Sequence, residues 1–264
     1  MEQAPLLVDR PLPGVAVVTF NRPEAHNALD TGLQRLLDAR LTDLEADAAV
    51  RCVVVTGAGE AAFSAGYDIH ELARLSPDEV TLALLQREEW MWHLASLRMP
   101  TIAAVNGFAH GAGALVAAAL DLRIGCEHTN FRFTAGAYGG ANATWSLPQL
   151  VGLGQAKELL FTSRPVGGEA ARRIGLLNAV VPAASLLDEA LGLATEIAAN
   201  PPEGITETKR LLHAGPGRAL QDRYEAENVV MRTTLRPKPM PELFARFLDA
   251  HVKSEDNGCP VATE

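Results

Sequence analysis

Short apolar runs and longer amphipathic stretches alternate along the chain up to residue 200. The apolar runs predict buried strands, at residues 6–9, 15–20, 50–56, 101–105, 121–126, 129–133 and 179–181. The amphipathic stretches predict helices, at residues 31–44, 76–97, 155–161, 168–174 and 186–199. Strands that alternate with helices favour an α/β fold with a core of βαβ units.

Two of these helices carry clear start signals. Asp30 or Thr31 can cap the first, in which leucines at helical spacing form one buried stripe. Ser76 precedes Pro77 and two acidic residues, which is the expected order of an N-cap, a first helical residue and an acidic first turn.

The stretch 100–125 combines a strand, a tight turn and a helix start. After the apolar run Thr101–Val105 come Asn106-Gly107 and then His110-Gly111-Ala112-Gly113. The next run, Ala114–Leu122, is apolar on nearly every side but too short to span a membrane, so it predicts a buried helix. Small residues at its start admit either a closely packed strand or a ligand oxygen held by the free N–H groups of the first turn. The sequence leaves both interpretations open.

The segment beyond Pro201-Pro202 has a different pattern. It predicts three helices and no strand, at residues 206–212, 220–235 and 242–253. We therefore divide the chain into a core of residues 1–200 and a helical region of residues 201–264. Amphipathic helices at a chain end often cover a neighbouring subunit, so an oligomer is expected.

Composition narrows the possible partners. A formal net charge of −9 on 264 residues, without a basic run, argues against nucleic acid and anionic membranes as partners. The cysteines Cys52, Cys126 and Cys259 have no metal-ligand spacing. The N-terminus does not read as a signal peptide, so a cytoplasmic protein is expected.

Two local motifs suggest other chemistries, and each lacks its expected context. The pattern Gly57-x-Gly59-x-x-Ala62 is a partial dinucleotide fingerprint, but no long helix opens at Gly59. Ser64 lies in an Ala-x-Ser-x-Gly segment close to a nucleophile elbow, with His213 or His251 as a possible base. An elbow needs a strand that leads directly into the serine, and we expect the nearest strand to end at Thr56.

Two glycine-containing loops, Ser64–Asp68 and Asn106–Gly113, point to a third chemistry when taken together. Both follow apolar strands, and both can present backbone N–H groups at a turn. Two such donors aimed at one oxygen would stabilise an enolate or a tetrahedral oxyanion.

These two loops, together with several longer stretches, resemble the enoyl-CoA hydratase/isomerase, or crotonase, superfamily. The resemblance covers nearly the whole chain, in the stretches NRPEAHNAL (21–29), FSAGYDI (63–69), PTIAAVNGFAHGAGALVAAALDLRI (100–124), LPQLVGLGQAKELLFTSRPVGGEAARRIGLLNAVVP (147–182) and ETKRLL (207–212). It implies a spiral of ββα units, a helical C-terminal trimerisation region, a homotrimer or hexamer, and an acyl-CoA thioester substrate. It implies no cofactor other than the coenzyme A of that substrate, and no metal.

The resemblance also assigns site residues. The oxyanion donors would be the backbone N–H groups of Tyr67 and Ala112. Coenzyme A would be held by a loop and by an adenine-contacting stretch, at Ala25, His26, Ala28, Ala65, Asp68 and Ile69. Gly111, Leu115 and Tyr138 would adjoin the acyl group.

The chain departs from the family at both hydratase glutamates. Leu115 stands one helical turn beyond the second donor, where the first glutamate is expected, and Ala137 stands at the second position. The segment after it, Tyr138–Asn142, is also short for the family. Losing each proton-transfer group typically costs a factor of about 10²–10⁴, so efficient hydration is not expected. Thioester hydrolysis, decarboxylation, C–C cleavage and a non-catalytic CoA-binding homologue stay open.

Few other side chains could move a proton. The Tyr67 hydroxyl could face the acyl pocket, and His110 precedes the helix start, although packing is the simpler role for His110. His93 loosely resembles a position of the family's dehalogenases, and Asp68 and Asp121 are more simply structural. Asn142 and Trp145 could line the acyl end. Phe247 and Lys253 are weak candidates for reaching coenzyme A.

Overall fold

The structure is a computed structural model that describes residues 4–235, 239 and 244. The chain divides into two compact units, Met1–Lys209 and Arg210–Glu264. Among the described residues no helix is both long enough and apolar enough to cross a membrane.

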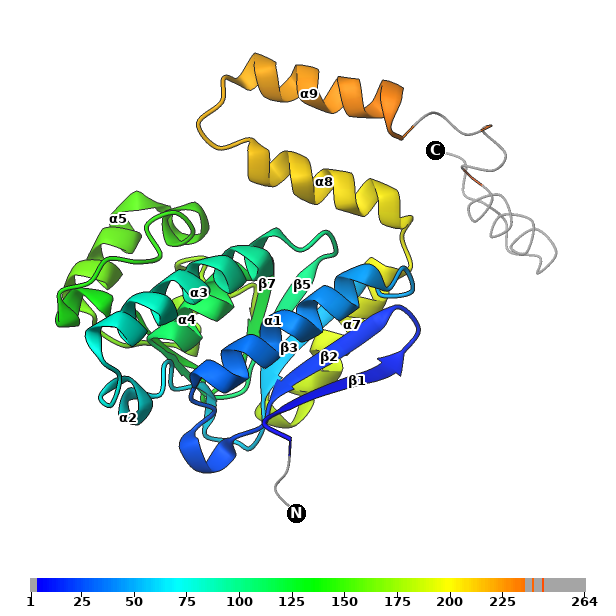
Figure 1. Ribbon diagram of the computed structural model, residues 1–264. Coiled ribbons are helices and arrows are strands. Elements are labelled where there is room, and N and C mark those ends of the chain that lie inside the picture. The colour runs from blue at the N-terminus through cyan, green and yellow to red at the C-terminus, as the bar shows by residue number, and fades with distance from the viewer. Residues whose placement is uncertain (1–3, 236–238, 240–243, 245–264) are drawn as a thin grey trace. The chain divides into compact units, whose positions relative to one another are not determined.

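A six-stranded sheet forms the centre of the first unit (Figure 1). Its order is β1-β2-β3-β5-β7-β10, with β1 antiparallel to β2 and all other pairs parallel. The strands span Leu6–Leu12, Val15–Phe20, Cys52–Gly57, Thr101–Val105, Leu122–Gly125 and Ala179–Val180. The central strands are buried on both faces, which explains why β3 and β5 read as continuous apolar runs.

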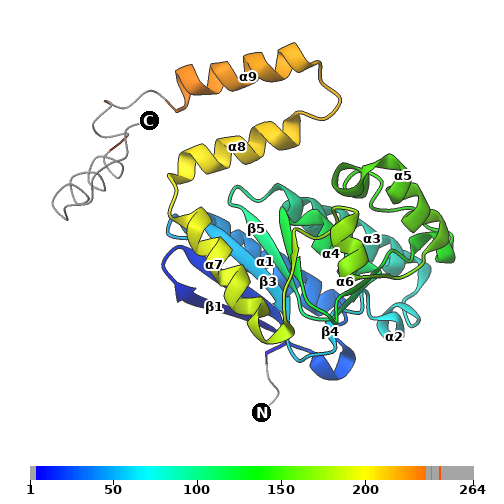
Figure 2. The ribbon, with the colours of Figure 1, turned by 180° about the vertical axis from the view of Figure 1, so that it is seen from behind.

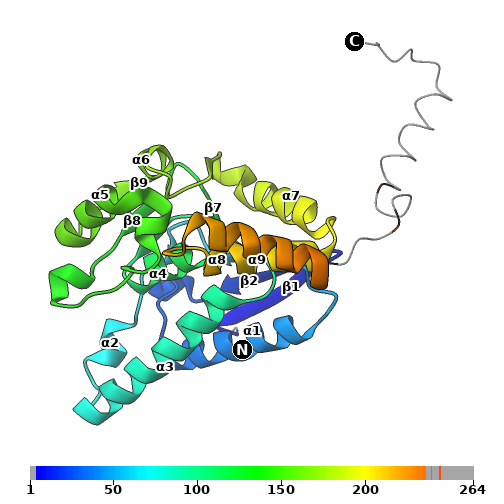
Figure 3. The same cartoon turned by 90° about the horizontal axis from the view of Figure 1, so that it is seen from above.

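Helices cover both faces of this sheet. Helix α7 (Leu186–Ala198) covers one face, where Ala190 and Ala194 pack on residues such as Val54 and Ile102 (Figure 2). The other face is covered by α1 (Thr31–Ala46), α3 (Pro77–Ser96) and α4 (Ala112–Ala119). Helices α1 and α3 lie side by side (Figures 1 and 3). This α/β arrangement confirms the fold class predicted from the alternation of strands and helices.

The predicted caps are both present. The side chain of Asp30 accepts a hydrogen bond from the Leu33 N–H at 2.7 Å. Ser76 and Glu79 form a reciprocal capping box, with Pro77 as the first residue of α3. The leucine stripe of α1 is buried, since Leu33, Leu37, Leu41 and Leu44 all lie in the core.

A second, four-stranded sheet was not predicted in full. Its order is β4-β6-β8-β9, with strands Ala62–Ser64, Phe108–His110, Asn130–Arg132 and Val166–Gly167. Only the β8 region had been expected as a strand. Strands of two or three residues have no readable hydrophobic period. They are held by pairing, as when β6 lies between β4 and β8.

The remaining elements of the first unit are short or kinked. They are α2 (Ile69–Leu72), α5 (Leu147–Thr162), α6 (Gly168–Arg173) and the 3₁₀ turns η1 (Pro23–Ala25), η2 (Ala135–Tyr138) and η3 (Ala183–Ser185). Helix α5 starts eight residues before the predicted 155–161 segment, because Gly152, with φ of +77°, interrupts its pattern.

Beyond Pro201 the described residues form two helices, α8 (Pro202–Ala214) and α9 (Leu220–Thr233). The first unit ends within α8, at Lys209. This lysine is only 8% exposed, and its ammonium group donates to Asp121 Oδ2 at 2.7 Å and to the Met99 carbonyl at 3.0 Å. Thr101 donates to the same carboxylate oxygen from its N–H and from its hydroxyl. The predicted helix 242–253, with Phe247 and Lys253, lies outside the described residues.

Candidate active site

The central stretch places a helix start beside a glycine with unusual backbone angles. Helix α4 begins at Ala112, directly after Gly111 (φ +51°, ψ −120°), and ends at Ala119. The expected helix Ala114–Leu122 is therefore wrong by two or three residues at each end. Gly111 turns the chain sharply enough to start the helix early, and the extended Leu120 leads into β7.

The loop after β4 runs past the same point. Gly66 has φ of +95°, in the region that favours glycine. The Gly66 carbonyl accepts from the Leu29 N–H at 2.8 Å, and the Asp68 N–H donates to the Leu29 carbonyl at 3.2 Å. These two bonds hold Tyr67 in an isolated bridge to Leu29.

The two glycine-containing loops are in direct contact. A Cβ on Gly66 would lie 2.7 Å from the His110 carbonyl oxygen and 2.9 Å from the Ala112 nitrogen. A Cβ on Gly113 would lie 2.2 Å from the carbonyl oxygen of Ser64. The small residues therefore do serve close packing, which was one of the two interpretations. In the part of the chain that the structure describes, the N–H groups of Tyr67 and Ala112 donate to no protein acceptor.

The predicted coenzyme A loop is a fixed turn. The Asn27 side chain donates to the carbonyls of Ala58 and Ala62 and accepts from the Arg22 N–H. His26 and Asn27 both have positive φ, and the His26 ring is exposed. The guanidinium of Arg22 donates to the Ala28 carbonyl at 2.7 Å, and this hydrogen bond fixes the C-terminal end of the turn. This turn leaves His26 exposed, Ala25 half-buried and Ala28 buried.

Asp68 has a structural role. Its Oδ1 accepts from the N–H groups of His70 and Glu71 and so caps α2, while Oδ2 lies 3.3 Å from Arg22. Partial burial raises the pKa of Asp68, but hydrogen bonds from Glu71 and Arg22 outweigh it and bring the pKa below its usual range. The other two residues of the predicted adenine-contacting stretch differ in solvent exposure, since Ala65 is half-buried and Ile69 is 70% exposed.

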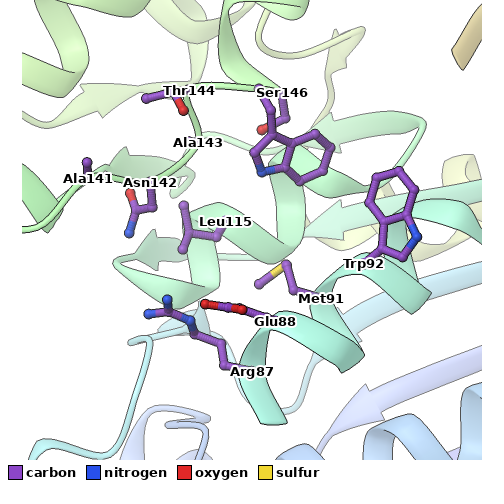
Figure 4. Close-up of a pocket in the computed structure, with 11 residues that line it drawn as sticks. Arg87, Glu88, Met91, Trp92, Leu115, Ala141, Asn142, Ala143, Thr144 and Ser146 are labelled. Carbon is purple, nitrogen blue, oxygen red and sulfur yellow. The ribbon is translucent and has the colours of Figure 1, made fainter. Parts of the chain in front are cut away.

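A pocket of about 310 Å³ opens at Leu115 (Figure 4). It is lined by residues of α3, by Leu115 of α4 and by the loop before α5, namely Arg87, Glu88, Met91, Trp92, Leu115, Ala141, Asn142, Ala143, Thr144, Trp145 and Ser146. The indole rings of Trp92 and Trp145 meet edge to face, with centroids 6.3 Å apart. Leu115, Asn142 and Trp145 thus line the same pocket.

Sequence reasoning expected the tryptophans of α3 in the core and the pocket wall, but it missed Arg87, Glu88 and Met91. Arg87 and Met91, and likewise Glu88 and Trp92, are four residues apart and share a helix face. Trp90, by contrast, is buried and donates to the Gln34 side chain at 3.0 Å. The sequence feature that could have indicated these residues was the predicted helix 76–97, which directly precedes the strand that leads to α4.

Tyr67 and Asn142 each bury a polar atom without a partner. The Tyr67 hydroxyl and the Asn142 Oδ1 have no hydrogen-bond partner, and among the described residues only Ser163 Oγ shares this condition. Burial raises the pKa of Tyr67 to about 12, and the nearby positive charge of Arg87 opposes that rise.

Other sequence candidates lie away from the pocket lining. Tyr138 is 85% exposed in η2, and Ala137 beside it is exposed as well. His110 is hydrogen-bonded to Asn130 at 3.2 Å, and burial lowers its pKa. His93 lies between the carboxylates of Asp38 and Glu45, at 2.6 Å and 3.5 Å.

Ser64 has no access to a substrate, although one sequence argument against it was wrong. A strand, β4, does lead directly into Ser64. The serine is fully buried, however, and its hydroxyl donates to the Asn27 carbonyl at 2.8 Å. The described residues contain no cluster of three or more histidine, cysteine, aspartate or glutamate side chains able to hold a metal ion.

Comparison with known proteins shows the family and the fold of the chain. The sequence profile of the enoyl-CoA hydratase/isomerase family matches residues 12–251. The short-chain-enoyl-CoA hydratase of Clostridium acetobutylicum is 37% identical, over 76% of this chain and 78% of that protein. The crystal structure of enoyl-CoA hydratase from Bacillus anthracis superimposes with a TM-score of 0.89 at 32% identity, covering 94% of this chain and 97% of that one.

An isomerase structure is also similar. A monofunctional enoyl CoA isomerase from M. smegmatis has a TM-score of 0.71 at 34% identity, covering 84% of this chain and 98% of that one. The resemblance noted in the sequence is therefore confirmed across fold and sequence. The chain has the α/β crotonase fold, with mixed sheets and C-terminal helices, and it belongs to the enoyl-CoA hydratase/isomerase family.

Proposed function

We propose that the protein is an enzyme that acts on acyl-CoA thioesters by stabilising negative charge on the thioester oxygen. The observation that carries this proposal is the close approach of Gly66 to Ala112, which brings together two backbone N–H groups without acceptors, those of Tyr67 and Ala112. Leu115, one turn along α4, lines the adjoining pocket.

The chemistry follows from where charge develops. The thioester oxygen becomes negative when the α-carbon loses a proton, when a carboxylate on the α-carbon leaves as CO₂ and its bonding electrons form the enolate, or when a nucleophile attacks the carbonyl carbon. Backbone donors on packed elements need no reorganisation to meet that charge, and one such donor is worth about 3 kcal/mol in the transition state. In this proposal coenzyme A passes the turn at Ala25 and His26, and its adenine end adjoins the stretch from Ala65 to Ile69.

Ordinary hydration is a poor fit to this site. Leu115 cannot exchange a proton, and Ala137 is exposed outside the pocket lining. The reactions that suit the site need mainly the oxyanion donors, and they are thioester hydrolysis, decarboxylation and C–C cleavage. We also propose a homotrimer or hexamer in which the region 201–264 contributes to subunit contacts.

The absence of both glutamates favours a second candidate, a CoA-binding homologue without activity. The two candidates differ in turnover, because both bind acyl-CoA and only the enzyme consumes it. A panel of acyl-CoA thioesters, followed by release of free coenzyme A and by mass spectrometry of the acyl product, separates them.

The first experiment compares wild type with Leu115→Glu on a short 2-enoyl-CoA, with Leu115→Gln as the matched control. We expect wild type and Leu115→Gln to be inactive and Leu115→Glu to gain hydration, since a carboxylate would then stand one turn beyond the second donor. Hydration by wild type at ordinary enzyme rates would show that the assignment of Leu115 and Ala137 as lost acids is wrong. Failure of every variant to bind any acyl-CoA would contradict the proposed function itself.

A further inference from the structure

Two buried polar atoms at or beside the acyl pocket could not be satisfied by a hydrocarbon chain: Asn142 lines the pocket, and Tyr67, which is outside the lining, interacts with the lining residue Arg87. Tyr67 Oη and Asn142 Oδ1 are both buried without a hydrogen-bond partner. An unsatisfied buried polar atom costs about 1–3 kcal/mol. Such a group calls for an explanation, and a ligand that completes its hydrogen bonds is one.

Arg87 adds a positive charge at the same place. It is half-buried on α3, and its guanidinium is close enough to the Tyr67 hydroxyl to interact with it. In the described part of the chain Arg87 forms no ion pair with a carboxylate, including that of Glu88 beside it. Figure 4 shows Arg87 and Asn142 extending into the pocket from a helix and from a loop, with Leu115 between these elements.

These groups match one kind of ligand oxygen. A neutral phenol and a guanidinium both donate, so an acceptor between them gains two hydrogen bonds, and a negatively charged acceptor gains most. The Asn142 amide can present its NH₂ group after a 180° rotation, which adds a third donor. Glu88 is exposed, so water screens its charge and weakens its repulsion of an anion.

Tyr67 sets how far this oxygen lies from the thioester. Its backbone N–H is one of the two proposed oxyanion donors, and its side chain leads from that point to the hydroxyl beside Arg87. A carboxylate bound there is separated from the thioester carbon by only a few chain atoms.

We propose that the pocket selects acyl-CoA thioesters whose short acyl chain carries a carboxylate, which Arg87 binds as an ion pair and the Tyr67 hydroxyl binds as a hydrogen-bond donor. This inference rests on the proposed function and names its substrate class. It also explains why a leucine can stand at position 115, where a glutamate is expected in the family. A pocket that binds a carboxylate gains nothing from another acidic side chain besides Glu88.

The test compares thioesters of equal length with and without the carboxylate, by titration calorimetry on the full-length protein. The pairs are malonyl-CoA with propanoyl-CoA, succinyl-CoA with butanoyl-CoA and glutaryl-CoA with pentanoyl-CoA. For at least one pair we expect wild type to bind the carboxylated thioester about tenfold or more tightly, because a desolvated charged hydrogen bond is worth about 1.5–3 kcal/mol. Arg87→Met should abolish that preference, because the carboxylated thioester should lose about tenfold or more in affinity and the plain thioester clearly less.

Two further variants sharpen the result. Tyr67→Phe should reduce the preference several-fold, and Arg40→Met should change neither affinity, because Arg40 pairs with Asp43 on the exposed side of α1. Equal affinities for every pair in wild type, or an equal loss for both members of a pair in Arg87→Met, would overturn this inference and leave the proposed function standing. Failure of all six thioesters to bind would overturn both.

Discussion

Gly66 and Ala112 lie so close together that a Cβ on Gly66 would come within 2.9 Å of the Ala112 nitrogen. The two residues are 46 positions apart in the sequence, and each belongs to a loop that carries one of the proposed oxyanion donors. The spacing between those donors is therefore set by contact between backbones, and it can be tested by adding a single methyl group.

Gly66→Ala should destabilise the protein and weaken acyl-CoA binding together. The φ of +95° costs an L-residue about 1–2 kcal/mol, and displacement of the α4 start adds to this. We expect a loss of about 2–4 kcal/mol in the free energy of unfolding, measured with urea. Gly139→Ala is the matched control, because Gly139 has φ of +74° with open space around its Cβ. It should cost about 1 kcal/mol and leave binding unchanged.

Ala112→Pro should remove one donor at the start of α4. Ala112 is the first residue of α4, a position at which proline is favoured and where the N–H has no intrahelical partner. Loss of one oxyanion donor typically lowers kcat by a factor of about 10²–10³, so kcat/KM for the best thioester substrate should fall by that amount. Ala112→Ser keeps the N–H and should stay within a few-fold of wild type. Equal activity of the proline and serine variants would exclude this N–H from the mechanism.

Lys209→Met should destabilise the first unit by about 3 kcal/mol. The substitution removes the ammonium from a largely buried Asp121 carboxylate, and breaking a buried ion pair on one side costs about 3–5 kcal/mol. Urea unfolding followed by circular dichroism measures the change. Asp43→Asn is the control, because Asp43 forms an exposed ion pair with Arg40 and should contribute less than about 1 kcal/mol. A loss for Lys209→Met no larger than this control would contradict the role assigned to Lys209.

Tyr67 should make the protein less stable in alkali. Its pKa is raised by burial from 10.0 to about 12, so the unfolded chain loses the phenolic proton first. The contribution of Tyr67 to the free energy of unfolding is therefore fully present below pH 10. It is lost between pH 10 and 12, by at most about 1.4 kcal/mol per pH unit. Tyr67→Phe should show a shallower fall in urea stability across this range, whereas Tyr138→Phe, at an exposed site, should keep the wild-type slope. The rise of the Cys52 pKa to about 12 leaves part of the slope in both variants.

Strong local signals were sufficient to predict much of the fold. The apolar runs at 15–20 and 101–105 are β2 and β5 with the same bounds, and the Ser76-Pro77 signal marks the start of α3. The strands β4 and β6 could not be predicted, because three residues have no period and their pairing is decided by residues far away in the sequence. The start of α4 at Ala112 depends on the backbone angles of Gly111, which the apolar pattern does not encode.

The candidate site was predictable in its backbone part and in some of its pocket lining, namely Leu115, Asn142 and Trp145. Glycine-containing loops after apolar strands pointed to the segments 64–68 and 106–113, and the resemblance to the family assigned the donors within them to Tyr67 and Ala112. The structure brings those loops into contact. Arg87 and Glu88 had no distinguishing pattern, since charged residues on a long helix usually face water, and their proximity to Leu115 follows from how α3 packs on α4. Tyr138 was expected near the acyl group, but the turn η2 directs it outward.

The contact of Gly66 and Gly113 with the neighbouring backbone affects how the sequence of this protein can evolve. The proposed oxyanion donors are main-chain groups, and a substitution at position 67 or 112 other than proline leaves them in place. Apart from Leu115 of α4, the residues that line the pocket come from α3 and from 141–146, which the two glycines do not touch. New substrates can thus be acquired by side-chain replacement in those two segments, while the charge-stabilising geometry is inherited unchanged.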